Sequence, residues 1–312
     1  MAKNSNLTKA KKAKNDEFYT QITDIEKELV HYHGQLRDKV VFCNCDDPEW
    51  SNFWRYFDLN FDHIGLKGLI ATHYDPEKPT YKLEIRRDPE TGKKLPPVRT
   101  DLKQNGDFRS PECVELLKEC DVVVTNPPFS LFREYVAQLM QYGKKFVIIG
   151  NMNAITYKEI FPLIKDNKLW YGPSISSGDR EFGVPDSYPL QAAGFRVDEK
   201  GKKYIRVKGV RWYTNLDHAK RHEPLTLFRR YYDDPSKYPH YDNYDAINVD
   251  RTVDIPEDYD GVMGVPISFL DKYCPEQFEI LGIANSARWI EYECYTLING
   301  RRIYNRILIR RK

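Results

Sequence analysis

The sequence lacks the long apolar segment of a membrane protein. Its 312 residues contain no uninterrupted apolar run of eighteen or more, the length that spans a bilayer as a helix. The first residues are rich in lysine and show neither an apolar stretch nor a small-residue cleavage site, so no secretory leader is expected. These absences predict a cytoplasmic protein without a membrane partner.

A surplus of charge of one sign is also absent. The 48 Lys and Arg nearly balance the 46 Asp and Glu, which excludes a general polycation. Any contact with nucleic acid would therefore come from local basic patches. The six cysteines include no CxxC pair, so neither a zinc knuckle nor a redox site is indicated, and no metal is expected.

The sequence does contain a regular alternation of apolar strands and amphipathic helices. Residues 39–45 (KVVFCNC), 68–74 (GLIATHY) and 121–125 (DVVVT) are short apolar runs typical of buried strands. Segments with helical spacing of apolar residues separate them, which indicates βαβ units and a parallel sheet. We predict an α/β fold with a doubly wound, Rossmann-like sheet.

Composition divides the chain into regions. Residues 1–15 are polar and rich in lysine, which predicts a flexible basic arm. Residues 16–220 carry the strand and helix alternation, and residues 77–104, dense in Lys, Arg and Pro, are predicted to form a hairpin inserted in that domain. Residues 221–312 are rich in Tyr, Asp and Pro and form a separate C-terminal region.

Polar turns follow three of the predicted strands, at residues 44–48, 74–76 and 125–129. In an open α/β sheet, ligands bind beyond the carboxyl ends of the strands. These turns are therefore predicted to line the functional site.

The last turn reads Asn126-Pro127-Pro128-Phe129. An aromatic amino group is a poor nucleophile because its lone pair is delocalised into the ring. The side-chain oxygen of Asn126 and the backbone carbonyl of Pro127 can accept its two N–H bonds, while the prolines fix the backbone and Phe129 offers a face on which a base can stack. The quartet predicts catalysis of transfer to an aromatic amine, and the alternative is a strand-ending proline turn capped by Asn.

The quartet resembles the signature of amino methyltransferases. The motifs DEFYTQ, VVFCNCDDPEWSNF, NGDF, TNPPF and VRWYTNLDH together resemble, in the same order, the EcoRI-type adenine-specific DNA methyltransferases, and the resemblance spans most of the chain. It implies methyl transfer from S-adenosyl-L-methionine to the exocyclic amino nitrogen of an adenine flipped out of double-stranded DNA. It also makes GAATTC a candidate recognition sequence and leaves open a separately acting restriction endonuclease as a partner, as well as the oligomeric state.

The resemblance implies a set of cofactor contacts. Residues 18–20 would lie against the methionine end of the cofactor, an acidic residue after the second strand would bind the ribose hydroxyls, and the NGDF motif would meet the adenine edge. The implied contacts are Phe18, Tyr19, Thr20, Asn44, Asp46, Asp47, Asp75, Asp107 and Phe108. The chain departs from many such enzymes because its turn after the first strand has no glycines, and each acid is alternatively an ordinary turn residue.

The resemblance also implies contacts with DNA. The motif containing Trp212, Tyr213 and Asn215 would help to enclose the flipped base. Residues 221–312 and the inserted hairpin hold basic and polar side chains that have no role in the strand-end site, which predicts that these two regions recognise the target sequence. The basic side chains expected to contact DNA are Lys11, Lys12, Lys14, Arg86, Arg87, Arg301 and Arg302. A solvated charged surface is the alternative for each of them.

The sequence leaves two other functions open. An N-methyltransferase acting on RNA or on a protein side-chain amide can also use Asn-Pro-Pro followed by an aromatic residue, but the early FYT, the late WYTN and the long C-terminal region argue against it. A catalytically silent DNA-binding module of the same fold is disfavoured by the intact quartet. A titration with the cofactor distinguishes the silent module from an enzyme.

Overall fold

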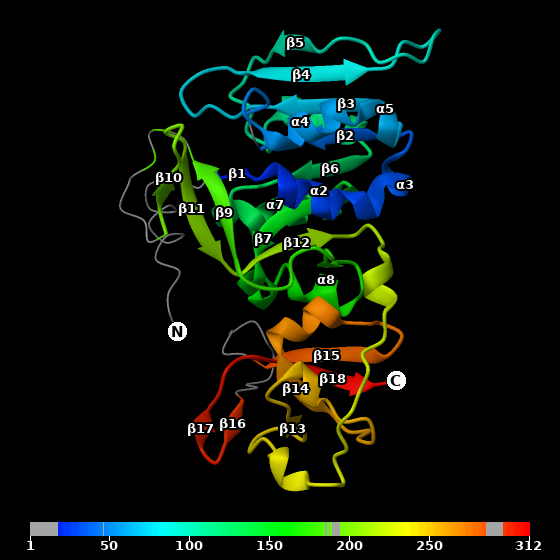
Figure 1. Cartoon of the computed structure of the whole chain (residues 1–312), viewed down its shortest axis with the longest axis vertical. Helices are drawn as coiled ribbons and strands as arrows, with labels where there is room; N and C mark the ends of the chain where they lie inside the picture. The colour runs from blue at the N-terminus through cyan, green and yellow to red at the C-terminus, as the bar shows by residue number, and fades with distance from the viewer. Residues whose placement is uncertain (1–17, 46, 185, 187, 189–193, 285–295) are drawn as a thin grey trace. The chain divides into compact units, whose positions relative to one another are not determined.

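The computed structural model describes residues 18–45, 47–184, 186, 188, 194–284 and 296–312. The predicted arm at residues 1–15, with Lys11, Lys12 and Lys14, and the predicted cofactor contact Asp46 lie outside them. The chain divides into two compact units, Met1–Ala154 with Ser177–Asp217 and Ile155–Ser176 with His218–Lys312 (Figure 1). Residues 155–176, placed by composition in the first domain, thus cluster with the C-terminal residues.

The first unit is built on a large mixed sheet, which confirms the predicted α/β class. Its parallel strands are adjacent to one another, and antiparallel strands flank them on both sides. In spatial order the strands are β5 (Val98–Asp101), β4 (Tyr81–Arg86), β3 (Gly68–Thr72), β2 (Val40–Cys43), β6 (Val122–Thr125), β7 (Lys145–Asn151) and β12 (Val210–Thr214) (Figure 1).

The sheet is mixed and not parallel throughout, because β4, β5 and β12 run antiparallel to their neighbours. The short connection from β3 to β4, residues 73–80, explains one of these reversals. A parallel neighbour needs a crossover of about a dozen residues or more, so a shorter segment returns the chain antiparallel.

Helices connect and cover the parallel strands. α4 contacts β3, α6 contacts β2 and α7 contacts β7. Ser110 caps α6 by accepting a hydrogen bond from the Cys113 amide at 3.3 Å, and Pro111 occupies the first turn, so this helix begins at residues whose types favour a helix start. The helices of this unit are α2 (Ile22–Leu29), η1 (Val30–Tyr32), α3 (His33–Leu36), α4 (Asn52–Leu59), α5 (Phe61–Ile64), α6 (Pro111–Glu119), η2 (Phe129–Leu131) and α7 (Phe132–Gln141), and η3 (Met152–Thr156) crosses into the second unit.

A small antiparallel sheet also belongs to the first unit (Figure 1). Its strands in order are β1 (Tyr19–Thr20), β9 (Asp179–Val184), β11 (Lys203–Lys208) and β10 (Arg196–Val197). The pairing of Tyr19 with Gly183 and of Thr20 with Phe182 fixes the early aromatic motif to this sheet.

The second unit has its own four-stranded sheet and a short hairpin. The order β13-β14-β18-β15 joins one parallel pair, β13 with β14, to antiparallel partners. Its elements are α8 (Phe161–Lys165), β8 (Trp170–Tyr171), η4 (Ala219–His222), η5 (Pro235–Lys237), β13 (Ile247–Asn248), η6 (Thr252–Asp254), β14 (Met263–Pro266), η7 (Ile267–Lys272), β15 (Phe278–Ala284), β16 (Leu297–Ile298), β17 (Arg301–Arg302) and β18 (Arg306–Arg311). In the described part of the chain, no helix has the length and apolar character needed to cross a bilayer.

Candidate active site

The Asn-Pro-Pro-Phe turn begins directly at the carboxyl end of β6, as the sequence predicts. Asn126 is buried, with 5% of its surface exposed. Its Nδ2 donates a hydrogen bond to the backbone carbonyl of Phe18 at 2.6 Å, while its Oδ1, also buried, accepts none from any described residue. Because an unpaired buried acceptor is costly, this oxygen is suited to an N–H donor brought by a ligand.

Phe18 links the early aromatic motif to this turn. Its ring lies 5.9 Å from that of Phe129 in an edge-to-face arrangement and 5.9 Å from that of Phe182 on β9. The Thr20 carbonyl accepts a hydrogen bond from Asn52 Nδ2 at 2.7 Å. The segment at residues 18–20 is thus held on both sides, and Phe18 in turn orients the amide of Asn126.

The turn after β2 carries two further predicted contacts. Asn44 is buried, and its Oδ1 accepts a hydrogen bond from the hydroxyl of Tyr135 on α7. Burial raises the pKa of that hydroxyl well above its usual value, so it remains a donor. Asp47 Oδ1 accepts from the Tyr81 hydroxyl at 2.6 Å and from the Glu49 amide at 3.0 Å.

A close backbone approach brings the NGDF loop to the end of β3. Gly106 has a φ of +74°, and a Cβ atom built on it would lie 1.9 Å from the carbonyl oxygen of His73. The Asp75 amide donates to the Asn105 carbonyl at 2.9 Å. The structure therefore places Asp75 and Asp107 on loops that touch each other, although they are far apart in the sequence.

The acid and the aromatic residue of the NGDF motif have defined partners. Hydrogen bonds from Arg109, whose Nη2 lies 2.7 Å from Asp107 Oδ2, hold the pKa of that carboxyl below its usual value. Phe108 is buried, with its ring 5.0 Å from that of Tyr135. Because Tyr135 also bonds to Asn44, this tyrosine connects the loop after β2 with the NGDF loop.

An open cavity of about 500 Å³ lies at this edge of the sheet, lined by Asp47, His73, Asp75, Tyr81 and Arg99 among others. The Arg99 guanidinium lies 3.5 Å from the centre of the Tyr81 ring. Two of the acids predicted to contact the cofactor, Asp47 and Asp75, therefore face one space. Their carboxylates differ in what holds Oδ1, because Asp47 Oδ1 accepts from the Tyr81 hydroxyl at 2.6 Å whereas Asp75 Oδ1 accepts from the Glu77 amide of its own turn at 3.0 Å. The second oxygens are alike, at 3.6 Å from His73 Nδ1 in Asp47 and at 3.7 Å from Lys78 Nζ in Asp75.

This difference gives a first prediction. Asp75→Ala should weaken cofactor binding about tenfold or more, because hydrogen bonds to a charged group contribute roughly 1.5–3 kcal/mol each. Isothermal titration with S-adenosyl-L-methionine measures it, and Asp88→Ala is the matched control, since Asp88 also caps a turn by accepting backbone N–H bonds but lies in the β4–β5 connection. Equal affinities for both variants would remove Asp75 from the site.

The late aromatic motif, residues 212–215, begins on β12 and ends at the residue that follows this strand. Trp212 and Tyr213 are fully buried, and the Tyr213 hydroxyl donates to the Asn151 carbonyl at 2.8 Å, at the carboxyl end of β7. The Asn215 side chain instead bonds to the Phe146 amide and the Lys144 carbonyl, both at 2.9 Å. Because β12 runs antiparallel to β7, Asn215 lies at the opposite edge of the sheet from Asn126, and the structure does not bring the two together.

The predicted basic contacts fall in separate places. Arg86 and Arg87 stand at the amino-terminal edge of β3, since Arg86 pairs with Gly68 in the ladder. Arg86 forms ion pairs with Glu84 and Glu119. Both arginines therefore lie away from the Asn126 edge.

The other basic residues predicted to contact DNA have different surroundings. Arg87 binds Asp62 at 2.8 Å and the Leu66 carbonyl at 2.6 Å. Arg301 and Arg302 are exposed on β17 of the second unit.

Three site residues were missed by sequence reasoning. Asn52, Tyr135 and Gly106 hold the segments that carry the predicted contacts. For Asn52 and Tyr135 the residue type gives no signal, because each reads as an ordinary helical position. Gly106 alone has a local signal, the Asn-Gly pair that is typical of a tight turn with a positive φ.

An α/β sheet whose buried parallel strand ends in Asn-Pro-Pro-Phe is typical of amino methyltransferases. The family model for the adenine-specific methyltransferase EcoRI matches residues 6–312. The type II methyltransferase M.EcoRI of Escherichia coli is 50% identical over 324 aligned residues, which cover 100% of this chain and 98% of the relative. M.MpnI of Mycoplasma pneumoniae is 41% identical, over 88% and 84% of the two chains, and M.MgeORF184P of Mycoplasma genitalium is 36% identical, over 98% of each.

The chain therefore belongs to the EcoRI family of adenine-specific methyltransferases. This confirms the family resemblance seen in the five motifs.

Proposed function

We propose that this protein transfers the methyl group of S-adenosyl-L-methionine to the N6 atom of an adenine flipped out of double-stranded DNA. The observation that carries the proposal is the open acceptor of Asn126. Its Nδ2 is engaged by Phe18, so its buried Oδ1 faces the place where an amino group would have to bind. Adenine N6 offers two N–H donors, and the Pro127 carbonyl is the second acceptor available in the same turn.

The cofactor fits the residues around this turn. Buried hydroxyl oxygens of Thr20 and Thr125 have no hydrogen-bond partner among the described residues, which suits a polar ligand that runs past β1 and β6. Asp75 would take the ribose hydroxyls, Asp107 and Phe108 the adenine, and residues 18–20 the methionine end. Asn44 and Asp47 would support the turn between them. When bound, the cofactor supplies a methyl carbon made electrophilic by a sulfonium.

The protein's contribution to the reaction is positioning and electrostatics. Asn126 Oδ1 and the Pro127 carbonyl hold the amine as its nitrogen becomes tetrahedral and positively charged, and the two acceptors stabilise that charge. Bound S-adenosyl-L-methionine would supply the methyl group to this nitrogen, and the two acceptors would hold the amine until its surplus proton leaves for solvent. Alignment of the two reactants supplies much of the rate.

Phe129 is proposed to hold the flipped base by stacking. The ring is half-buried and its edge-to-face contact with Phe18 sets its orientation. We expect Phe129→Ala to lower turnover and to leave 2-aminopurine at the target position more mobile, whereas Phe129→Tyr should be tolerated. Steady-state fluorescence of the probe and methylation of the same duplex measure both effects. Unchanged fluorescence and turnover in Phe129→Ala would assign this ring to the core.

The other parts of the chain would provide the scaffold of the site and the contacts with DNA. The sheet of the first unit would be the Rossmann-like, doubly wound catalytic domain with the β4–β5 pair as its insertion. Residues 221–312 would read the target sequence. Lys11, Lys12 and Lys14, as part of the arm, and Arg301 and Arg302 would contact phosphates.

A direct assay tests the proposed function. Incubation of the protein with S-adenosyl-L-methionine and plasmid DNA, followed by nucleoside mass spectrometry, should detect N6-methyladenine. Parallel reactions with RNA and with a mixed protein extract address the alternative acceptors. Methyl transfer to RNA or protein alone would contradict the proposal, and cofactor binding without any transfer would indicate the silent module.

A further inference from the structure

The second unit contains a cavity of about 450 Å³ whose lining carries both basic and acidic side chains. Four basic and four acidic side chains face it. A groove for phosphates alone would be lined by one sign of charge, whereas the edges of base pairs present donors and acceptors side by side. A balanced lining therefore matches base edges better than a DNA backbone.

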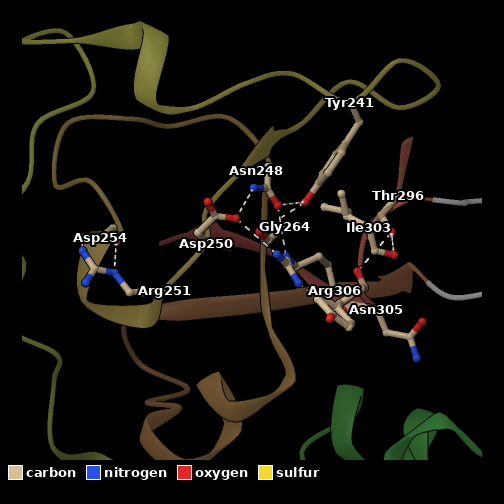
Figure 2. Close-up of polar contacts among 11 residues, drawn as sticks. Tyr241, Asn248, Asp250, Arg251, Asp254, Gly264, Thr296, Ile303, Asn305 and Arg306 are labelled. Atoms are coloured by element: carbon tan, nitrogen blue, oxygen red, sulfur yellow. Dashed lines mark hydrogen bonds and ion pairs between the residues drawn. The ribbon is translucent and has the colours of Figure 1, made fainter. Parts of the chain in front are cut away.

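Arg251 is held in one orientation at this cavity (Figure 2). Its Nε and Nη2 donate to Asp254 Oδ2 and Oδ1 at 2.7 and 3.1 Å. Asp254 is 21% exposed against 69% for Arg251, and its backbone carbonyl accepts from the buried Tyr238 hydroxyl at 3.0 Å. The carboxylate is thus a fixed support for an exposed guanidinium.

The free end of this guanidinium has the geometry that guanine requires. Among the described residues, none accepts a hydrogen bond from Arg251 Nη1. With Nε and one Nη2 hydrogen engaged, the Nη1 and Nη2 donors at the end of the fork remain for a ligand. Two parallel donors of this kind match O6 and N7 of guanine in the major groove.

The neighbouring residue Asp250 is held through one of its carboxylate oxygens and offers the other as an acceptor. Its Oδ1 accepts from Asn248 Nδ2 at 2.7 Å and lies 3.4 Å from Arg306 Nη2. Asn248 Oδ1 in turn accepts from the buried Tyr241 hydroxyl at 2.9 Å and from Arg306 Nε at 3.1 Å, so a connected network leads from the core to this carboxylate (Figure 2).

The network leaves one oxygen of Asp250 open to solvent. The side chain is 78% exposed, although Arg306 behind it is only 8% exposed. Its Oδ2 has no hydrogen-bond partner among the described residues. An exposed carboxylate oxygen whose partner oxygen is anchored can accept from the exocyclic amino group of cytosine or adenine.

We propose that this cavity is a base-reading site in which Arg251 recognises a guanine and Asp250 an amino group of a neighbouring base in the major groove. The inference rests on the proposed function for its DNA substrate. It identifies residues that set the sequence specificity and is independent of the catalytic chemistry.

The test uses selection of bound duplexes from a randomised DNA library, which needs no methyl transfer. Wild-type protein should select one motif that contains guanine. Arg251→Lys keeps the charge but loses the bidentate fork, so it should lose roughly fivefold to 150-fold of discrimination at one guanine while its binding to unselected DNA stays the same. Asp250→Asn should relax a different position.

Arg310→Lys is the matched control, because Arg310 is exposed on β18 of the same unit and forms no ion pair with any described residue. It should select the wild-type motif. If Arg251→Lys and Asp250→Asn also select that motif with unchanged discrimination, the inference is wrong. If the wild-type protein selects a motif but does not methylate it, the proposed function is wrong and the base-reading site stands. If it methylates DNA without selecting any motif, the base-reading site is wrong and the proposed function stands.

Discussion

Asn126→Ala should lower kcat for DNA methylation about a hundredfold to a thousandfold and leave the affinity for S-adenosyl-L-methionine nearly unchanged. Removing one acceptor that stabilises developing charge typically costs roughly 2.7–4 kcal/mol in the transition state. The Phe18 carbonyl holds Asn126 Nδ2, and the proposed role of Oδ1 is to accept from the substrate amine, so the loss should fall on catalysis and spare the cofactor. Single-turnover methylation of a saturating duplex separates this effect from DNA binding.

Asn151→Ala is the matched control for this prediction. Asn151 ends the adjacent parallel strand β7, and among the described residues its side chain bonds to backbone groups alone, the Lys208 carbonyl and the Asn153 amide. The same chemical change there should leave kcat within a few fold of wild type. Near-wild-type turnover in Asn126→Ala would exclude the amide from catalysis, and loss of cofactor binding in that variant would indicate a collapsed site.

Much of the catalytic unit could be predicted from the sequence, because its signals are local. Buried strands appear as continuous apolar runs, and the helix at residues 111–119 begins where Ser110 and Pro111 place it. The position of Asn126 at a carboxyl strand end follows from the same pattern. The antiparallel direction of β12 was not predicted, because periodicity within a strand carries no information on its direction.

Contacts between distant segments could not be predicted in this way. Asn215 follows a strand whose register is set across the sheet by β7, which places its side chain at the edge away from Asn126. The base-reading proposal depends on Asn248, Asp250 and Arg306, which meet only because β13 and β18 both flank β14. No local pattern in the sequence marks either arrangement.

The approach of the NGDF loop to β3 leads to the second large prediction, Gly106→Ala. An alanine at a φ of +74° costs about 1–2 kcal/mol in any context. The added Cβ would also lie 1.9 Å from the His73 carbonyl oxygen, and relieving such a backbone clash typically costs a further 1–3 kcal/mol. We expect a total loss of roughly 2–5 kcal/mol in the free energy of unfolding, together with weaker cofactor binding because Asp107 moves with the loop.

Gly201→Ala separates the two contributions. Gly201 has nearly the same backbone conformation, with a φ of +77°, but no atom lies within 4 Å of the Cβ it would gain. This control should therefore lose only the conformational part, about 1–2 kcal/mol, and bind the cofactor normally. Urea unfolding and calorimetric titration of both variants measure the difference. Equal losses would show that the NGDF loop can shift away from His73 at no cost, and normal cofactor affinity in Gly106→Ala would separate that loop from the cofactor site.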